Sequence, residues 1–450
     1  MRRTKIVCTL GPASSDERVM ENMLQHGMNV ARLNFSHGTH EYHKELMDTF
    51  RAVRDRLQVP AAVLLDTKGP EIRIGTFEEG GVMLAEGSRF VLTTEEIVGD
   101  ASRVSVGCKT LPLKLKTGDR VLLDDGRISL IVDQCTDTEV QCTVRHGGEL
   151  KDKKGINVPH VPLDLPYLSE QDKADLLFGI DQEVDFIAAS FVRRKEDVIA
   201  LRRFLDYNGG HSIRIISKIE NLEGIENFDE ILKHSDGIMV ARGDMGVEVA
   251  YEKLPGLQKK FIKRCYQAGK MVITATQMLE SMVTNPMPTR AEITDVANAV
   301  FDGTSAVMLS GESAAGKYPV QAVRTMAKIV EQAEEDAFSM DIYKGIKYEL
   351  DISDTTNAVC DAACTMARDM NARAIIAVTK YGHTARRMSK FRPREPIVAA
   401  TPVCKTYHQL SLSWGVCPVR RGVRIRRTSC LFTPLTVQSS STWSQTAIGW

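Results

Sequence analysis

Short, almost wholly apolar runs alternate with longer amphipathic stretches along most of the chain. The amphipathic stretches are typical of helices, and runs that are apolar throughout are typical of parallel strands covered on both faces. Repeated strand–helix units of this kind predict an α/β fold, and eight of them close into a (β/α)8 or TIM barrel, with its chemistry at the carboxyl ends of the strands. Eight such runs occur, at residues 5–10, 29–34, 61–66, 186–190, 213–219, 237–241, 271–276 and 306–310.

The pattern changes between the third and fourth runs. Residues 69–165 show period-2 alternation in place of a helical period, for example at 120–123 and 128–132 on either side of the turn Asp124-Asp125-Gly126. This alternation predicts strands joined by tight turns. We therefore expect an inserted all-β domain, a β-barrel lid over the mouth of the main barrel.

The chain after the eighth run predicts a second α/β unit. Asp354 is placed to cap a helix that runs through Met370. Further strands are expected at 373–379 and 397–400, and further helices at 321–338, 384–391 and 405–412. This order is typical of a doubly wound domain, here an incomplete one. The expected domains are the catalytic barrel at 1–68 and 166–340, the lid at 69–165, a C-terminal regulatory and assembly domain at 341–419, and an atypical tail at 420–450.

The tail differs from the rest of the chain in composition. Residues 420–450 hold five arginines and no acidic residue, and ten of the twenty residues at 428–447 are Ser or Thr, with no helical or strand period. Three interpretations stay open: a solvated tail, a patch for nucleic acid or lipid, or a sequence that departs from its natural reading frame.

Composition and charge exclude several classes of protein. The 450 residues suffice for about three domains, and 43% hydrophobic with 26% charged residues is typical of a globular protein. No apolar run approaches the ~18 residues of a membrane span, and the apolar run after the basic start is too short for a signal peptide. Because 58 basic residues balance 58 acidic ones and the ten cysteines are scattered, we expect a cytoplasmic protein with reduced thiols and neither nucleic acid nor membrane as a partner.

The strongest cluster of candidate chemistry joins Lys218, Glu220 and Asp244 at the ends of two adjacent runs. Two carboxylates on neighbouring strand ends can hold Mg²⁺ and leave coordination positions for substrate and water. A lysine beside them would supply positive charge to a transferring phosphoryl group. The structural alternative is a salt-bridged cap on the barrel.

Residues next to this cluster suit an anionic substrate. Gly243 and Gly246 let backbone N–H groups approach a small carboxylate, although a plain turn is the alternative. Thr276 shares its strand parity with Thr274 and would orient or relay a proton near the substrate.

A second cluster follows the second and third runs and consists of Arg32, Asn34, Ser36, Asp66 and Thr67. Its oxygen atoms carry little charge, which suits a large monovalent cation, while Arg32 suits a phosphate or carboxylate. A hydrogen-bonded network of strand ends is the structural alternative. Arg73, at the hinge into the lid, would contact a phosphate when the lid closes or else be an ordinary surface arginine.

With these motifs assembled, the chain closely resembles the pyruvate kinase family of the bacterial type. The resemblance is carried by the segments KIVCTLGPAS, NVARLNFSHG, LLDTKGPEIR, IISKIEN, GIMVARGDMGVE, ITATQMLESM and PTRAEITDVANAVFDGTSAVMLSGESAAGKYP. It implies glycolytic phosphoryl transfer from phosphoenolpyruvate to ADP, giving pyruvate and ATP. It also implies a Mg²⁺ or Mn²⁺ ion and K⁺ as cofactors.

The resemblance assigns roles residue by residue. It makes Lys218 the transition-state stabiliser and Thr276 a catalytic residue, and it places Arg32, Gly243, Asp244 and Thr276 on the substrate. It implies Glu220 and Asp244 as ligands of the divalent ion, Asn34, Ser36, Asp66 and Thr67 as the potassium site, and Arg73 and Lys154 as contacts of the nucleotide phosphates.

Regulation and assembly are less well matched. Glu71 is the residue type of potassium-dependent members of the family, so potassium dependence is expected. The family also implies a homotetramer and a sugar-phosphate effector. The sequence departs from the family after about Val419, which leaves assembly and effector control open. The competing functions are a metal-dependent barrel lyase or aldolase acting on pyruvate-like acids, and a truncated chain with impaired assembly and activity.

Overall fold

The computed structural model describes residues 1–161, 166–343 and 354–420. Its centre is a closed barrel of eight parallel strands in the order β1-β17-β16-β15-β14-β13-β3-β2. Every strand corresponds to one predicted apolar run, so the TIM barrel is confirmed. The strands are β1 Lys5–Thr9, β2 Val30–Asn34, β3 Ala62–Asp66, β13 Phe186–Ala189, β14 Arg214–Ile219, β15 Gly237–Ala241, β16 Met271–Ala275 and β17 Ala306–Leu309.

Alternate residues of these strands face two different cores. Val7, Leu64 and Ile216 pack together inside the barrel, whereas Ile6 and Leu65 pack against the surrounding helices. Burial on both faces explains why the runs are apolar throughout. The surrounding helices are α1 Glu17–Gln25, α2 His40–Leu57, α4 Glu170–Asp181, α5 Lys195–Tyr207, α6 Leu222–Glu226, α7 Phe228–His234, α8 Arg242–Glu248, α9 Leu254–Gln267, α10 Arg290–Phe301, α11 Gly311–Ala314 and α12 Pro319–Ser339, with short 3₁₀ turns η1 Pro12–Ser14, η2 Tyr251–Lys253 and η3 Glu280–Val283.

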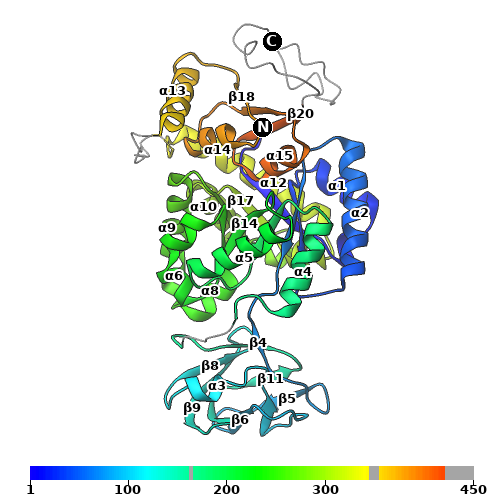
Figure 1. Cartoon of the computed structure of the whole chain (residues 1–450), viewed down its shortest axis with the longest axis vertical. Coiled ribbons are helices and arrows are strands. Elements are labelled where there is room, and N and C mark those ends of the chain that lie inside the picture. Colours follow the sequence, from blue (N-terminus) through cyan, green and yellow to red (C-terminus); the bar gives the residue numbers. More distant parts are fainter. Residues whose placement is uncertain (162–165, 344–353, 421–450) are drawn as a thin grey trace.

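A separate β domain extends from the carboxyl end of β3 and lies beyond that end of the barrel (Figure 1). Its seven-stranded sheet has the order β4-β12-β8-β9-β10-β6-β7, and a backbone bridge between Ile74 and Val106 connects its two edges, so that the sheet curls round on itself. The elements are β4 Ile72–Arg73, β6 Arg89–Thr93, β7 Arg103–Ser105, β8 Arg120–Leu123, β9 Ile128–Cys135, β10 Glu139–His146 and β12 Gly155–Asn157, with the pair β5 Gly81–Leu84 and β11 Gly148–Lys151 and the short helix α3 Leu111–Lys114.

The C-terminal unit is a parallel sheet in the order β18-β19-β20 with helices packed on it. Asp354 caps the first helix as predicted, because its carboxylate accepts from the N–H groups of Thr356 and Asn357. The strand β20 was not predicted, since it is short, contains Pro418 and runs into the basic tail. The elements are α13 Thr355–Asp369, β18 Ile375–Val378, α14 His383–Lys390, β19 Ile397–Thr401, α15 Cys404–Gln409, η4 Leu410–Leu412 and β20 Val416–Arg420.

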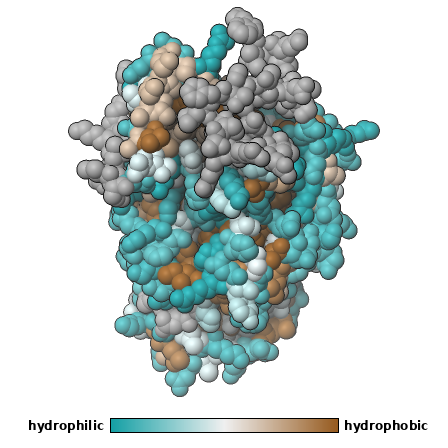
Figure 2. All heavy atoms as spheres, turned by 45° about the horizontal axis from the view of Figure 1, so that its top comes forward, coloured by the Kyte–Doolittle hydropathy of each residue, from teal (hydrophilic) through white to brown (hydrophobic). Residues whose placement is uncertain are grey.

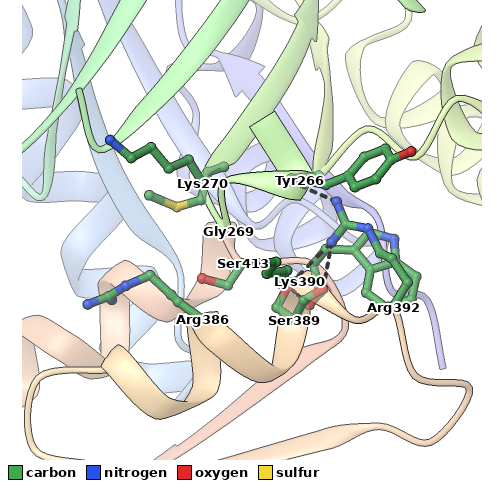
Figure 3. A pocket seen from close by; sticks show the side chains of 11 residues that line it. Tyr266, Gly269, Lys270, Arg386, Ser389, Lys390, Arg392 and Ser413 are labelled. Atoms are coloured by element: carbon green, nitrogen blue, oxygen red, sulfur yellow. Dashed lines mark hydrogen bonds between the residues drawn. The ribbon is translucent and has the colours of Figure 1, made fainter. Parts of the chain in front are cut away.

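This unit packs against the amino ends of the barrel strands (Figure 3). It lies opposite the inserted β domain, which is called the lid from here on (Figure 1). The ammonium of Lys5, the first residue of β1, donates to the Val416 carbonyl at 2.8 Å, and the Gly415 N–H donates to the Arg3 carbonyl at 3.0 Å. The face drawn in Figure 2 is mostly hydrophilic, with hydrophobic residues in small scattered groups. Among the described helices, none combines the length and the apolar character that crossing a membrane requires. The interpretations of residues 421–450 lie outside the described residues.

Candidate active site

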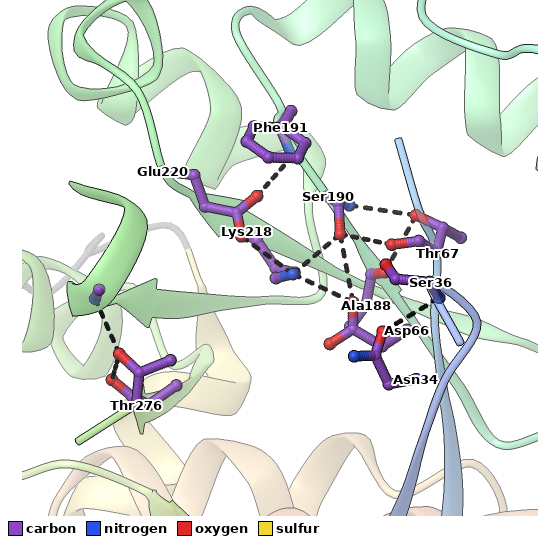
Figure 4. Close-up of polar contacts among 12 residues, drawn as sticks. Asn34, Ser36, Asp66, Thr67, Ala188, Ser190, Phe191, Lys218, Glu220 and Thr276 are labelled. Atoms are coloured by element: carbon purple, nitrogen blue, oxygen red, sulfur yellow. Dashed lines mark hydrogen bonds and ion pairs between the residues drawn. The ribbon is translucent and has the colours of Figure 1, made fainter. Parts of the chain in front are cut away.

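Three neighbouring strands bring the first polar side chains together at the mouth of the barrel. Asp66 ends β3, Ser190 directly follows β13, and Lys218 lies near the end of β14. These strands pair in parallel, with Ala188 opposite Asp66, so their carboxyl ends reach the same edge of the barrel. The side chains therefore converge although they are far apart in the sequence (Figure 4).

Lys218 lies at the centre of this cluster. Its ammonium is 2.9 Å from Glu220, 3.1 Å from Asp66 and 2.8 Å from the Ser190 hydroxyl, and the side chain is almost wholly buried. Burial alone would lower the pKa of Lys218, but the carboxylates of Asp66 and Glu220 outweigh it and raise the pKa above its ordinary value. Lys218 is therefore held as a fixed positive charge.

A second fixed cation lies beside it. Arg32, on β2, donates through Nε to Asp66 at 2.6 Å and through a terminal nitrogen to the Thr9 hydroxyl at 2.9 Å. Burial would raise the pKa of Asp66, but Arg32 and Lys218 together lower it below its usual range. Asp66 thus stays ionised and orients both cations toward the mouth.

Glu220 and Asp244 form a pair of buried carboxylates. Burial raises the pKa of Glu220 to about 7, against the opposing charge of Lys218, and the negative charge of Asp244 adds to the rise. Burial also raises the pKa of Asp244, and the negative charge of Asp125 in the lid raises it further. Two carboxylates that resist ionising together in one buried place form a site that a divalent cation would stabilise.

Gly243 and Asp244 do not lie at the end of a strand, where the sequence predicted this cluster. The strand β15 ends at Ala241, so both residues lie in the first turn of helix α8 and not at the strand end. The predicted helix start after the strand is confirmed. Its first turn places the Asp244 carboxylate near Glu220, and the two side chains interact directly.

The prediction that Thr274 and Thr276 lie on one strand and face the same way was wrong. The strand β16 ends at Ala275, and Thr276 adopts a left-handed backbone conformation with φ of 69°. Thr274 instead is buried and donates to the Thr304 hydroxyl at 2.9 Å. The Thr276 hydroxyl reaches the mouth by this backbone turn, where it accepts from the Gly243 N–H at 2.8 Å and donates to the Ala275 carbonyl at 2.6 Å.

The residues of the second cluster also come together. Asn34 lies opposite Asp66 in the β2–β3 register, and its side-chain oxygen accepts from the Ser36 N–H at 3.2 Å. The Thr67 hydroxyl accepts from the Ser190 N–H at 3.2 Å. Because Arg32 and Lys218 already neutralise Asp66, the pocket is rich in oxygen and low in charge, which fits a monovalent cation.

Arg73 and Lys154 lie in the lid and have carboxylate partners of their own. Arg73 pairs with Glu71 at 2.7 Å and donates to the Lys153 carbonyl at 2.8 Å. Lys154 pairs with Asp124 at 2.7 Å. Neither residue is brought into contact with Lys218.

A cavity of about 340 Å³ separates the lid from the barrel. Glu71, Asp125 and His160 line it from the lid, and Asp244 and Glu248 line it from the barrel. Its size is that of a small-molecule site, and Asp244 of the carboxylate pair lines it.

Sequence reasoning missed two residues of this site. Ser190 is buried between Lys218, Asp66 and the Thr67 carbonyl, which lies 2.6 Å from its hydroxyl. The sequence feature that could have identified Ser190 is its place at the end of the fourth apolar run. Asp125 was interpreted only as a turn residue, because nothing local places that turn against Asp244.

The donor set around Glu220 and Asp244 is small. Among the residues that the structure describes, no three His, Cys, Asp or Glu side chains gather closely enough to hold a metal. A pair of carboxylates such as Glu220 and Asp244 would leave the other coordination positions of a Mg²⁺ ion to water or substrate oxygens, which is how this ion is usually bound.

A closed (β/α)8 barrel with two fixed cations and two crowded carboxylates at its mouth defines an enzyme that handles small phosphorylated or carboxylated anions. Comparison with known families identifies the family within this class of enzyme. Residues 1–323 match the family model "Pyruvate kinase, barrel domain", and residues 357–431 match "Pyruvate kinase, alpha/beta domain". The second match extends beyond Val419, where the sequence pattern changes.

Curated relatives agree with the family models. The chain is 48% identical to the pyruvate kinase of Clostridium acetobutylicum over 93% of its own length and 89% of the relative. It is 49% identical to that of Staphylococcus haemolyticus over 93% of its own length and 72% of the relative, and 46% identical to that of Clostridium perfringens over 92% and 88%. The chain belongs to the pyruvate kinase family.

Proposed function

We propose that the chain transfers the phosphoryl group of phosphoenolpyruvate to ADP, giving pyruvate and ATP, with a divalent ion and potassium bound at the barrel mouth. Membership of the family supports the reaction. The single observation that carries the mechanism is the buried Lys218 ammonium, which lies within 3.1 Å of Asp66 and Glu220 at the open end of the barrel.

Lys218 and Arg32 would neutralise the anionic substrate. Their carboxylate partners hold both cations in place, so little reorganisation is needed when charge develops on the migrating phosphoryl group. The leaving enolate becomes pyruvate when a proton reaches its terminal carbon. The Thr276 hydroxyl, held next to Gly243, is the group that would orient this proton delivery.

Glu220 and Asp244 would hold Mg²⁺ or Mn²⁺, which supplies positive charge to the phosphate oxygens when bound. Asn34, Ser36, Asp66 and Thr67 would hold potassium. Arg73 and Lys154 would exchange Glu71 and Asp124 for the nucleotide phosphates as the lid closes.

The location that fits this proposal is the cytoplasm. The nine cysteines that the structure describes are all free thiols, which is the usual state in a reducing compartment.

A coupled assay for pyruvate tests the proposed reaction. The purified chain receives phosphoenolpyruvate and ADP, and ADP, the divalent ion and potassium are omitted one at a time. We expect pyruvate formation to require ADP, to fall to background without the divalent ion and to drop strongly when potassium is replaced by tetramethylammonium. Pyruvate release without ADP would instead support the lyase or aldolase.

A further inference from the structure

The loop that follows strand β2 carries part of the proposed potassium site. β2 ends at Asn34 and helix α2 begins at His40, so Ser36 lies in the loop between them. The Asn34 side chain accepts from the Ser36 N–H at 3.2 Å (Figure 4), and the Phe35 N–H donates to the Asp66 carbonyl at 3.0 Å. Because the oxygen atoms of a cation site must be held at fixed positions, this loop needs a support.

His43, on the buried face of α2, contacts this loop on both sides of Ser36. Its Nε2 lies 2.7 Å from the His37 carbonyl oxygen, and its ring stacks on that of Phe35, with 4.1 Å between the ring centroids and 12° between the planes. A carbonyl oxygen only accepts, so Nε2 carries the proton and donates it to this hydrogen bond. One side chain therefore holds the residue before Ser36 and the residue after it.

The imidazole of His43 is itself well fixed, since it is only 3% exposed. Burial lowers its pKa below the ordinary value of histidine, so the ring is neutral at pH 7 and donates at one nitrogen only. Its other nitrogen, Nδ1, has no hydrogen-bond partner among the described residues. The single ring proton of His43 is thus used to hold the loop.

Gly38 brings the backbone of the loop directly against the same face of α2. Its φ is 82°, and a Cβ atom at this position would lie 2.8 Å from the Tyr42 ring and 3.3 Å from Nε2 of His43. Glycine is the residue that tolerates both this conformation and this approach. The loop therefore packs on α2 at His43 with no spare room.

An aromatic cluster between α2 and α4 offers a purely structural role for His43. Phe35 also contacts Phe178, with ring centroids 5.8 Å apart, and His40 stacks on Phe178 at 4.5 Å. Packing in such a cluster requires a ring but no hydrogen-bond donor. A substitution that keeps the ring and removes the donor therefore separates the two roles.

We propose that His43 is a positioning residue for the monovalent cation. It fixes the backbone of Ser36 from both sides, and with it the oxygen atoms that Ser36 and Asn34 present to potassium. The inference rests on the proposed potassium site. It concerns potassium alone, because Glu220 and Asp244, which would hold the divalent ion, belong to other elements of the barrel.

The variant His43→Phe tests this role, with potassium as the probe. Potassium chloride replaces tetramethylammonium chloride at constant ionic strength and constant magnesium, and the melting temperature and the rate of pyruvate formation are measured as two separate readouts. We expect potassium to stabilise the parent saturably, and His43→Phe to need about fivefold more potassium for half of the effect in both readouts, because one hydrogen bond to the loop is lost. Turnover at saturating potassium should stay within about twofold of the parent's.

Three further variants accompany this experiment. His43→Gln keeps an N–H donor at a similar reach and should restore a potassium requirement near that of the parent. His408→Phe makes the same substitution at another buried histidine, on α15, and should leave the potassium requirement unchanged. Gly38→Ala displaces the loop without changing His43 and should also weaken potassium binding, which decides the question if His43→Phe does not fold.

A magnesium titration at saturating potassium completes the test, and His43→Phe should give the parent's half-saturation. Equal potassium requirements in the parent and in His43→Phe would overturn the inference and leave the potassium site in place. Equal rises in the potassium and magnesium requirements would also overturn it, since general damage to the mouth acts on both ions. A parent that does not respond to potassium would overturn the inference together with the potassium site, but not the transfer to ADP, which the omission of ADP tests separately.

Discussion

At the scale of single residues, the most unusual feature of this protein is a group of four buried, ionisable side chains at the mouth of the barrel. Arg32, Lys218, Asp66 and Glu220 are all at least nine-tenths buried, which is unusual for ionisable side chains. Each has an opposite charge within 3.1 Å, and the exact pairing compensates for the loss of water. The result is a set of preorganised charges, which is the arrangement that stabilises a phosphoryl-transfer transition state.

Removing the central cation should therefore act on the chemical step. We expect Lys218→Met to lower kcat by a factor that corresponds to about 2–4 kcal/mol, with a smaller change in KM, because the lysine's charge matters most in the transition state. Steady-state kinetics of pyruvate formation measure both parameters. Lys173→Met, on the surface helix α4, is the control and should behave like the parent. Near-normal turnover of Lys218→Met would show that its assigned role is wrong.

At the scale of elements, α15 joins the C-terminal unit to the barrel floor. Gln409 donates to the Ser212 carbonyl at 2.8 Å, Lys405 donates to the Glu183 carbonyl at 2.6 Å, and His408 is buried between them. Burial, with Arg54 adding a like charge, lowers the pKa of His408 to about 4. The folded protein thus holds this imidazole neutral.

This shift predicts a loss of stability in acid. The ordinary pKa of histidine is about 6.5, so between about pH 6.5 and 4 the unfolded chain takes up a proton that folded His408 does not. The contribution of His408 is complete above that interval and is lost as the pH falls through it, by up to about 3 kcal/mol. Urea unfolding at several pH values should show a shallower pH dependence in His408→Gln.

The exposed His211→Gln serves as the control for this experiment and should keep the parent's pH dependence. An unchanged slope in His408→Gln would mean that other groups cause the acid sensitivity.

The elements also show where local pattern succeeds. The eight barrel strands were predictable because each is apolar on both faces, and α13 was predictable because Asp354 caps it. The end of β16 was misplaced by one residue, since the left-handed turn at Thr276 depends on its contact with Gly243 and not on local preference. β20 was missed because its pairing with β19, and not its sequence, makes it a strand.

At the scale of the whole molecule, the catalytic mouth and the C-terminal unit lie at opposite ends of the barrel (Figure 1). The sheet of that unit ends at β18, which has no second neighbouring strand among the described residues. Ile376 and Val378 point from it into solvent, at 53% and 43% exposure. An exposed apolar edge strand favours association with other chains.

A charge on this edge should reduce that association. We expect Ile376→Lys to lower concentration-dependent association several-fold in light scattering while leaving turnover unchanged, because the edge is remote from Lys218. Val359→Lys places the same charge on the exposed face of α13, away from the edge, and should have little effect. A clean tetramer of the parent chain in gel filtration, without larger species, would contradict the expected association through this edge.

The sequence by itself determined the barrel, the β domain inserted into it and the family, because strand burial and short motifs are local properties. Only the tertiary structure decided which partners the charges take. Lys218 and Asp66 are 152 residues apart, and their contact exists because eight strands close into a barrel. The same closure places Ser190 between them. The position of the inserted β domain over the mouth brings Asp125 toward Asp244. Such contacts depend on distances between remote segments, which no local pattern of polar and apolar residues encodes.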